Sequence, residues 1–158
     1  MIIRIKKAKI TAEKKISMIY EKRSKTGSWD EYSFTCSEEA RPEFYKAMEK
    51  LAKHVIEMCE LPEDYFSKIT VRGVSFSYGG PDETMGATIS AAMALEKSYP
   101  NLNLNTPHKA SEMYSDSPAD PMQLLSAECI EDLTVLLEEC EYYIEGDRAQ
   151  GSMFTNVA

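Results

Sequence analysis

The fold of this chain is decided by residues 69–95, which read Ile69-Thr-Val-Arg-Gly-Val-Ser-Phe-Ser-Tyr-Gly-Gly-Pro-Asp-Glu-Thr-Met-Gly-Ala-Thr-Ile-Ser-Ala-Ala-Met-Ala-Leu95. Apolar and polar residues alternate on both sides of the segment 79–83, and alternation with a period of two is typical of strands with one buried face. The first apolar series is Val74, Phe76 and Tyr78, and the second is Met85, Ala87, Ile89, Ala91, Met93 and Leu95. Residues 79–83, Gly-Gly-Pro-Asp-Glu, supply the backbone conformations of a turn. The sequence therefore predicts a long hairpin at the centre of an antiparallel sheet.

The same stretch also predicts an irregularity at Gly73 and leaves one alternative for its second half. Ile69 and Val71 have the opposite phase to Val74, so Gly73 marks a bulge or a close backbone approach. An Ala-rich helix over residues 84–97 is the alternative to the second strand. We favour the strand because the alternation extends over six apolar positions.

The N-terminal third predicts three more strands, over residues 2–12, 15–24 and 29–36, joined by short turns into a meander. Ile3 and Ile5 share one phase, whereas Ala8 and Ile10 share the other. This change of phase indicates a bulge near Lys6 and Lys7.

Two helices are expected. The first starts near Pro42 and ends at Pro62, and its apolar stripe is Phe44, Met48, Leu51, Val55 and Met58. The second covers residues 120–145, with Asp120 as its N-cap and Gly146 as its C-terminal stop. Residues 99–119 contain three asparagines and three prolines, and we expect an ordered but irregular excursion there.

These elements predict an α+β fold, in which an antiparallel sheet of about five strands carries two helices on one face, in the order β-β-β-α-β-β-loop-α. The chain of 158 residues has the length of one domain. We expect a single domain over residues 1–146 and a flexible C-terminal tail over residues 147–158.

The composition limits the location and the chemistry. No apolar run approaches the roughly 20 residues that span a bilayer, and the N-terminus lacks the order of a signal peptide, so we expect a cytosolic protein. Four cysteines have no paired spacing of the metal-binding kind and fit small buried apolar residues: Cys36, Cys59, Cys129 and Cys140. We expect neither a metal nor a cofactor.

Charge is distributed unevenly along the chain. Residues 1–25 hold nine Lys or Arg and two Glu, a net charge of +7, and the remainder holds nine basic and 24 acidic residues, a net charge of −15. The basic segment, including Lys6, Lys7 and Lys9, has three interpretations: contact with phosphate, contact with the acidic part of a second copy, or a solvated edge hairpin.

Signatures of catalysis are absent from the sequence: there is no phosphate-binding glycine loop, no nucleophile elbow and no zinc-binding histidine pair. His54 flanks the apolar stripe of the first helix without a catalytic partner nearby in sequence. We therefore favour a non-enzymatic protein and leave an unfamiliar catalytic site open.

Candidate ligand-binding residues are polar groups in the irregular segment and isolated cations elsewhere. Asparagine and histidine side chains supply hydrogen bonds, Tyr78 precedes two glycines that let a ligand approach the backbone, and the two arginines are scarce cations suited to an anion. The set is Arg72, Tyr78, Asn101, Asn103, Asn105, His108 and Arg148. The alternatives are loop capping by the asparagines and neutralisation of Arg148 by Asp147 or by the helix dipole.

Two stretches, Val71-Arg-Gly-Val-Ser-Phe-Ser-Tyr-Gly-Gly80 and Leu102-Asn-Leu-Asn-Thr-Pro-His-Lys109, resemble those of small, mostly uncharacterised proteins of phages and prophages of Gram-positive bacteria. The resemblance covers most of residues 30–150. It implies an accessory protein acting in the host bacterial cytoplasm, of the kind that counters host defence by binding a host protein or by sequestering a nucleotide signal.

Together these observations predict a non-enzymatic binding protein, a homo-oligomer, that sequesters a small anionic, nucleotide-like ligand. The alternative is a protein–protein or nucleic-acid interaction module that uses the basic hairpin or the acidic C-terminal helix. Ligand sequestration predicts that Arg72→Ala or Arg148→Ala abolishes binding, whereas the alternative predicts a larger effect of charge reversal at Lys6, Lys7 and Lys9.

Overall fold

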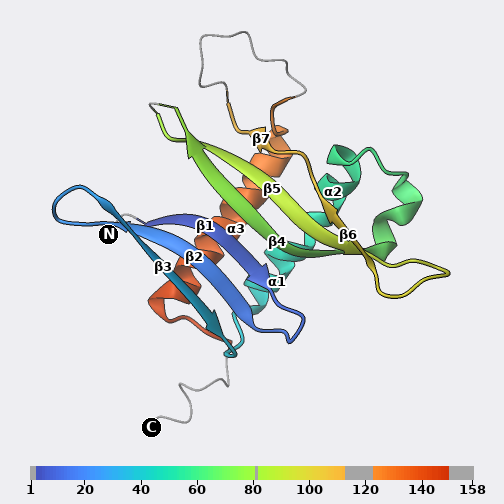
Figure 1. The fold of residues 1–158 in the computed structure, drawn as a ribbon, viewed down its shortest axis with the longest axis horizontal. Coiled ribbons are helices and arrows are strands. Elements are labelled where there is room, and N and C mark those ends of the chain that lie inside the picture. The colour runs from blue at the N-terminus through green and yellow to red at the C-terminus, as the bar shows by residue number, and fades with distance from the viewer. Residues whose placement is uncertain (1–2, 81, 113–122, 150–158) are drawn as a thin grey trace.

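A computed structural model describes residues 3–80, 82–112 and 123–149 of the chain. Its strands form one sheet in the order β3-β2-β1-β4-β5-β6, with β7 also pairing with β5, and every ladder is antiparallel (Figure 1). The elements in chain order are β1 Ile3–Ile10, β2 Ile16–Arg23, β3 Trp29–Cys36, α1 Pro42–Glu49, α2 Ala52–Met58, the 3₁₀-helix η1 Glu63–Lys68, β4 Ile69–Gly79, β5 Thr84–Met93, β6 Leu102–Asn105, β7 Lys109–Ala110 and α3 Ala127–Glu145.

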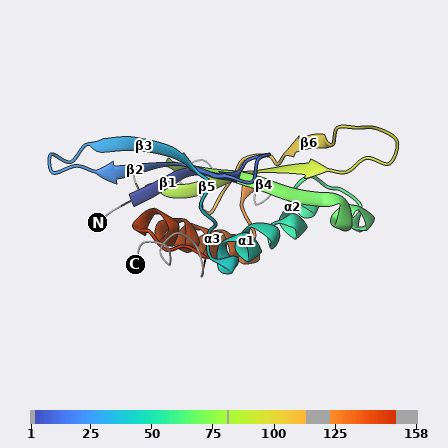
Figure 2. The ribbon, with the colours of Figure 1, turned by 90° about the horizontal axis from the view of Figure 1, so that it is seen from below.

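The helices form a single layer beneath one face of the sheet, and the opposite face carries none of the described helices (Figure 2). The core lies between the two layers and contains inward side chains of the central strands packed against Phe44, Leu51, Leu133 and Leu136. The predicted α+β class, with an antiparallel sheet and helices on one face, is confirmed. The described part contains more strands and one more α-helix than the sequence predicted.

The central hairpin is confirmed as strands β4 and β5, paired from Ile69↔Met93 to Gly79↔Thr84. Its register shifts between Val71 and Gly73, so the predicted bulge is also present. A Cβ atom on Gly73 would lie 2.5 Å from the Cβ of Lys9 and 2.7 Å from the carbonyl oxygen of Ala8. Glycine is needed at this position because β1 approaches β4 too closely for any side chain.

The N-terminal meander pairs β1 with β2 and β2 with β3, and the predicted bulge lies between Ile5 and Lys7. Among the described residues, three pairs then join the meander to the central hairpin: Lys7↔Ser75, Ala8↔Val74 and Lys9↔Gly73. Beyond these pairs the two halves of the sheet diverge (Figure 1). We call this short ladder the seam.

The predicted first helix is two helices, α1 and α2, separated by a turn at Lys50 and Leu51. The amides of Leu51 and His54 donate to carbonyls three residues back, at 3.2 and 3.0 Å, which tightens the chain locally. Leu51 stays fully buried, so the apolar stripe continues through the turn.

The segment 99–119 is more regular than the sequence suggested. Residues 102–105 form β6 and residues 109–110 form β7, both paired with β5, while residues 113–119 lie outside the described part. Thr106 extends the pairing, because its amide donates to the Ile89 carbonyl at 2.9 Å and its hydroxyl accepts from the Ile89 amide at 2.9 Å. The expectation of an irregular segment was therefore wrong for its first half.

The last described helix starts later than predicted. Ser126, in extended backbone conformation, caps α3 by accepting a hydrogen bond from the Cys129 amide at 3.1 Å, whereas the predicted cap Asp120 lies outside the described residues. Gly146 ends the helix with φ +112° as predicted. Of the predicted tail, residues 147–149 are described, and the Ala149 amide donates to the Glu39 carbonyl at 3.0 Å. Within the described ranges, no helix has the length and apolar character that crossing a membrane requires.

Candidate functional site

The sheet face turned away from the helices, which we call the open face, is free of acidic side chains over its central strands. Strands β1, β4, β5, β6 and β7 contain no Asp or Glu at any position. Ala8 points into the core and is fully buried, so its neighbours Lys7 and Lys9 extend from the open face, where both are exposed. In a chain of net charge −8, this face is locally basic.

The bulge in β4 adds a third cation beside Lys9. Val71 and Val74 are both buried, so Arg72 and Gly73 lie together on the open face. A bulge places two consecutive residues opposite one residue of the neighbouring strand and changes the direction of a side chain. Gly73 pairs with Lys9, which brings the exposed Arg72 next to Lys9.

These two cations line a pocket of about 500 Å³, the sheet-side pocket. Its described lining residues come from β1, the β1–β2 turn, β4, β5, β6 and the segment before β6: Lys9, Ile10, Thr11, Ala12, Arg72, Ala92, Tyr99, Pro100, Asn101 and Asn103. Three of the predicted ligand-binding residues, Arg72, Asn101 and Asn103, thus meet at one site. Lys9, predicted as part of an interaction surface, belongs to the same site.

Arg72 differs from the other arginines in having no partner among the described residues. Arg4 and Arg41 form ion pairs, and Arg23 lies over the Trp29 ring at 5.9 Å. A guanidinium without a counter-charge, beside an ammonium, favours an anion in the pocket.

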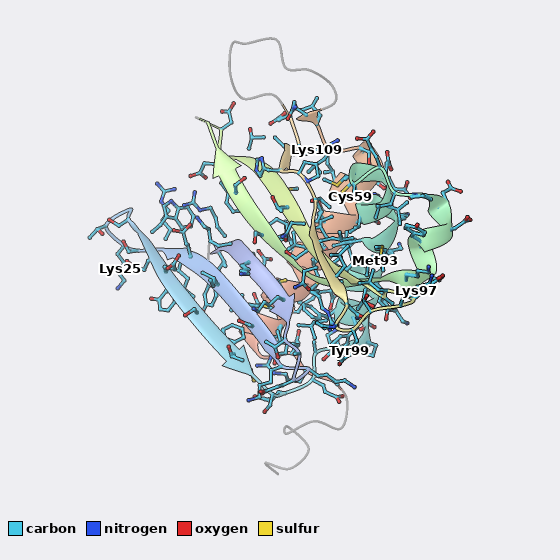
Figure 3. All side chains as sticks on the ribbon, turned by 45° about the vertical axis from the view of Figure 1, so that its right-hand side comes forward. Lys25, Cys59, Met93, Lys97, Tyr99 and Lys109 are labelled. Atoms are coloured by element: carbon cyan, nitrogen blue, oxygen red, sulfur yellow. The ribbon has the colours of Figure 1, made fainter. Side chains whose placement is uncertain are left out.

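Tyr99 supplies an aromatic surface at the rim of the pocket. Its side chain is 93% exposed, the highest value among the exposed large hydrophobic residues. Lys25, at the tip of the β2–β3 hairpin, lies far from Tyr99 (Figure 3). The basic N-terminal segment therefore reaches this pocket through β1 and not through the hairpin tip.

Asn105 and His108 lie on the open face but outside the described pocket lining. Asn105 Oδ1 accepts a hydrogen bond from the Ser90 hydroxyl at 2.8 Å. His108 Nε2 lies 2.7 Å from Ser77 Oγ, and the ring covers Gly86, where an added Cβ would be 2.5 Å from Nε2. Both side chains are already bonded to neighbouring strands.

Two predicted ligand-binding residues are placed away from the sheet-side pocket, each bonded within the fold. The Tyr78 hydroxyl donates to the Ile5 carbonyl at 2.8 Å, and burial raises the pKa of Tyr78 to about 12. Arg148 lies 3.7 Å from the centre of the Tyr143 ring and 3.3 Å from Glu38 Oε2. Lys6, at the β1 bulge, is half-buried and does not line the pocket among its described residues.

A second pocket, of about 590 Å³, lies in the helical layer, and we call it the helix-side pocket. It is lined by Lys53, His54, Ile56, Glu57, Glu60, Leu61, Glu63, Phe66 and Glu128. His54, 2% exposed, holds Asp132 Oδ2 at 2.7 Å, and Lys53 contacts Asp132 and Glu128.

Sequence reasoning missed the partner of His54 because Asp132 is 78 residues away. The available signal was an acid at the edge of the apolar stripe of α3, three residues after Cys129 and next to Leu133. Burial, with the nearby Asp132 charge, raises the pKa of the Cys129 thiol to about 12. That thiol therefore stays protonated at neutral pH and is a poor nucleophile.

All four cysteines are free thiols, and no group of three or more potential metal ligands occurs among the described residues. Comparisons of this chain with protein-family models, with curated proteins and with solved structures find no match. The geometry of the two pockets is therefore the basis for inferring a function.

Proposed function

We propose that this chain is a binding protein that holds a small anionic, nucleotide-like ligand in the sheet-side pocket. One observation carries the proposal: Arg72 and Lys9, which have no counter-charge among the described residues, line the same pocket as the exposed aromatic ring of Tyr99. This combination matches a ligand with a phosphate at one end and a planar base at the other.

Five of the lining side chains have a role in this arrangement. The Arg72 guanidinium presents two parallel N–H groups to phosphate oxygens, and Lys9 adds a second positive charge. Tyr99 stacks on the base, an interaction worth about 1–3 kcal/mol per base in single-strand binders. The amides of Asn101 and Asn103 both donate and accept hydrogen bonds, which suits the edge of a base or a sugar.

The described lining supports binding without cleavage. It contains no carboxylate, imidazole or thiol, and these are the side chains that most often act as the general base in hydrolysis. A protein of this kind lowers the free concentration of its ligand by holding it. We extend the proposal to a setting in the host bacterial cytoplasm, where a phage-type accessory protein sequesters a nucleotide signal of the host defence.

Homo-oligomerisation remains a prediction. It is supported by the open face, which is basic, and by α3, which with its C-terminal flank carries eight acids and no base from Glu128 to Asp147. Native mass measured at low and high protein concentration tests it, and a monomer at both concentrations contradicts it.

Calorimetric titration with a nucleoside monophosphate and with its parent nucleoside tests the ligand class. We expect the monophosphate to bind at least tenfold more tightly, because the cations contact only the phosphate. Arg72→Ala should remove this difference. Lys46→Ala is the matched control, because Lys46 is an exposed cation on α1 in the other layer. Equal binding of nucleoside and monophosphate, or no binding of either, contradicts the proposed function.

A further inference from the structure

We infer that the ligand contains two phosphates separated by a sugar, and is therefore a phosphodiester-linked nucleotide chain two to three residues long. This inference rests on the proposed function and specifies the ligand of the same site. It follows from the spacing of cations along β1.

Lys7 and Lys9 occupy alternate positions of a regular part of β1, on the open face. Alternate side chains of an antiparallel strand are about 6.8 Å apart. Lys9 pairs with Gly73, next to Arg72, and Lys7 pairs with Ser75. If one phosphate binds at Arg72 and Lys9, Lys7 therefore offers a second cationic site two residues away on the same strand.

The surface between these positions favours an anionic chain. Lys7 has no ion-pair or hydrogen-bond partner among the described residues. Ser75 and Thr88 lie beside it in register and provide hydroxyl donors. No acid occurs in β1, β4 or β5, so nothing on these strands repels a second phosphate.

The spacing distinguishes a phosphodiester chain from a nucleoside triphosphate. In a triphosphate, neighbouring phosphorus atoms share one bridging oxygen, so they are too close together to match two alternate strand positions. In a 5′-phosphorylated dinucleotide, a sugar separates the phosphates. The dinucleotide can therefore contact Arg72 and Lys9 with one phosphate and Lys7 with the other.

The row of unpaired cations formed by Arg72, Lys9 and Lys7 does not extend to Arg4, the cation of β1 on the other side of the bulge. Its Nη1 lies 2.9 Å from Glu83 Oε1, its Nη2 lies 2.9 Å from Glu21 Oε1, and its guanidinium covers the Trp29 ring at 3.8 Å. Both acids neutralise Arg4, and Lys6 at the bulge is half-buried, so among the described residues β1 offers no further exposed, unpaired cation beyond Lys7. This limits the ligand to two or three nucleotides.

The test measures the affinities of 5′-phosphorylated thymidine mono-, di-, tri- and hexanucleotides and of thymidine triphosphate. We expect the dinucleotide to bind about tenfold more tightly than the mononucleotide, which corresponds to about 1.4 kcal/mol, with no further gain beyond the trinucleotide. Lys7→Ala should reduce dinucleotide affinity to the mononucleotide level and leave mononucleotide and triphosphate affinities unchanged. Lys46→Ala should change none of them.

Three results overturn the inference in different ways. Equal affinities for mono- and dinucleotide, with no effect of Lys7→Ala, refute it while the proposed function stands. Affinity that keeps rising to the hexanucleotide indicates an open nucleic-acid interface and refutes the length limit. No binding of any of these compounds refutes the proposed function itself, and the inference with it.

Discussion

The sheet-side and helix-side pockets are similar in volume, about 500 and 590 Å³, but differ in the state of their charges. In the helix-side pocket, Lys53 is neutralised by Glu128 and Asp132. In the sheet-side pocket, Arg72 and Lys9 have no counter-charge among the described residues. Pocket size therefore says little about function here, whereas the presence of unpaired cations indicates which pocket is suited to an anion.

This difference arises from the segregation of acids between layers. The central strands contain no Asp or Glu, while α3 and its flank contain eight acids and no base. Along the sequence the basic excess lies in residues 1–25, whereas in the fold the contrast is between central strands without acids and the acidic helix α3. Lys50 and Lys53 lie within 4 Å of Asp132, whereas Lys7, Lys9 and Arg72 on the open face have no ion-pair partner among the described residues.

Reversing the charge of one cation in each pocket should give the largest difference in nucleotide affinity between two variants. Arg72→Glu should weaken nucleotide binding at least a hundredfold, because it removes a charge-assisted contact and adds repulsion, together worth about 3 kcal/mol. Lys53→Glu should leave nucleotide affinity unchanged but lower stability, since it adds a third acid beside Glu128 and Asp132. Calorimetry and thermal unfolding of both variants measure this contrast. An equal loss of affinity in the two variants would contradict it.

The two histidines should differ almost as much in their contribution to stability. His54→Ala removes the buried partner of Asp132 and should cost about 3 kcal/mol in the free energy of unfolding. His108→Ala removes only an exposed bond to Ser77 and should cost about 0.5 kcal/mol. Urea unfolding of both variants tests this, and nucleotide affinity per folded molecule should survive His54→Ala. Similar costs would show that the His54–Asp132 pair contributes little.

A glycine at the seam should matter more than one in a turn. Gly73→Ala places a methyl group 2.5 Å from Lys9 Cβ and should cost about 2 kcal/mol, and it should also weaken nucleotide binding by displacing Lys9. Gly27→Ala meets open space and should cost about 1 kcal/mol through its φ of +89° alone. Unfolding and titration measure both effects, and unchanged affinity in Gly73→Ala would argue against a role of Lys9.

Exposed aromatic rings at the two pockets provide a smaller contrast. Tyr99→Ala should reduce nucleotide affinity about tenfold, whereas Tyr99→Phe should retain it, because stacking needs the ring and not the hydroxyl. Phe66→Ala, at the helix-side pocket, is the matched control and should have no effect. Loss of affinity in Tyr99→Phe would instead assign a hydrogen bond to the hydroxyl.

The smallest effect concerns Tyr78, which joins the two halves of the sheet outside both pockets. Below pH 10 the wild type should be more stable than Tyr78→Phe by about 1 kcal/mol, through the bond to the Ile5 carbonyl. Because the pKa of Tyr78 is about 12 in the folded protein and about 10 when unfolded, the unfolded state loses its proton first. The advantage should therefore shrink as pH rises from 10 to 12. Stability of both proteins measured across this range tests the sign.

Local patterns in the sequence were sufficient for the hairpin, both bulges and the end of α3. Each depends on residues close together in the chain: the alternation around Val74, the phase change at Gly73 and the stop at Gly146. Strand β6 was missed because asparagine disfavours strands, although Leu102 and Leu104 alternate with asparagines as strand residues do.

The candidate site was only partly predictable, because it depends on which charges cancel across the fold. Arg72 and Arg148 looked equivalent in sequence, yet Arg148 pairs with Glu38, 110 positions earlier in the chain, and Arg72 has no described partner. Lys9 was assigned to a different hypothesis and shares the pocket with Arg72 only because β1 and β4 are neighbours. No local pattern contains this information.

Ligand binding should stabilise the seam between β1 and β4. In the described part of the chain, three residue pairs join the N-terminal meander to the central hairpin, and Lys9 and Arg72 lie on opposite sides of that junction. A phosphate held by both side chains bridges this short ladder and makes its opening rarer. Exchange of amide hydrogens with deuterium at residues 7–9 and 73–75 should therefore slow when the ligand is bound, which reports occupancy without any label on the ligand.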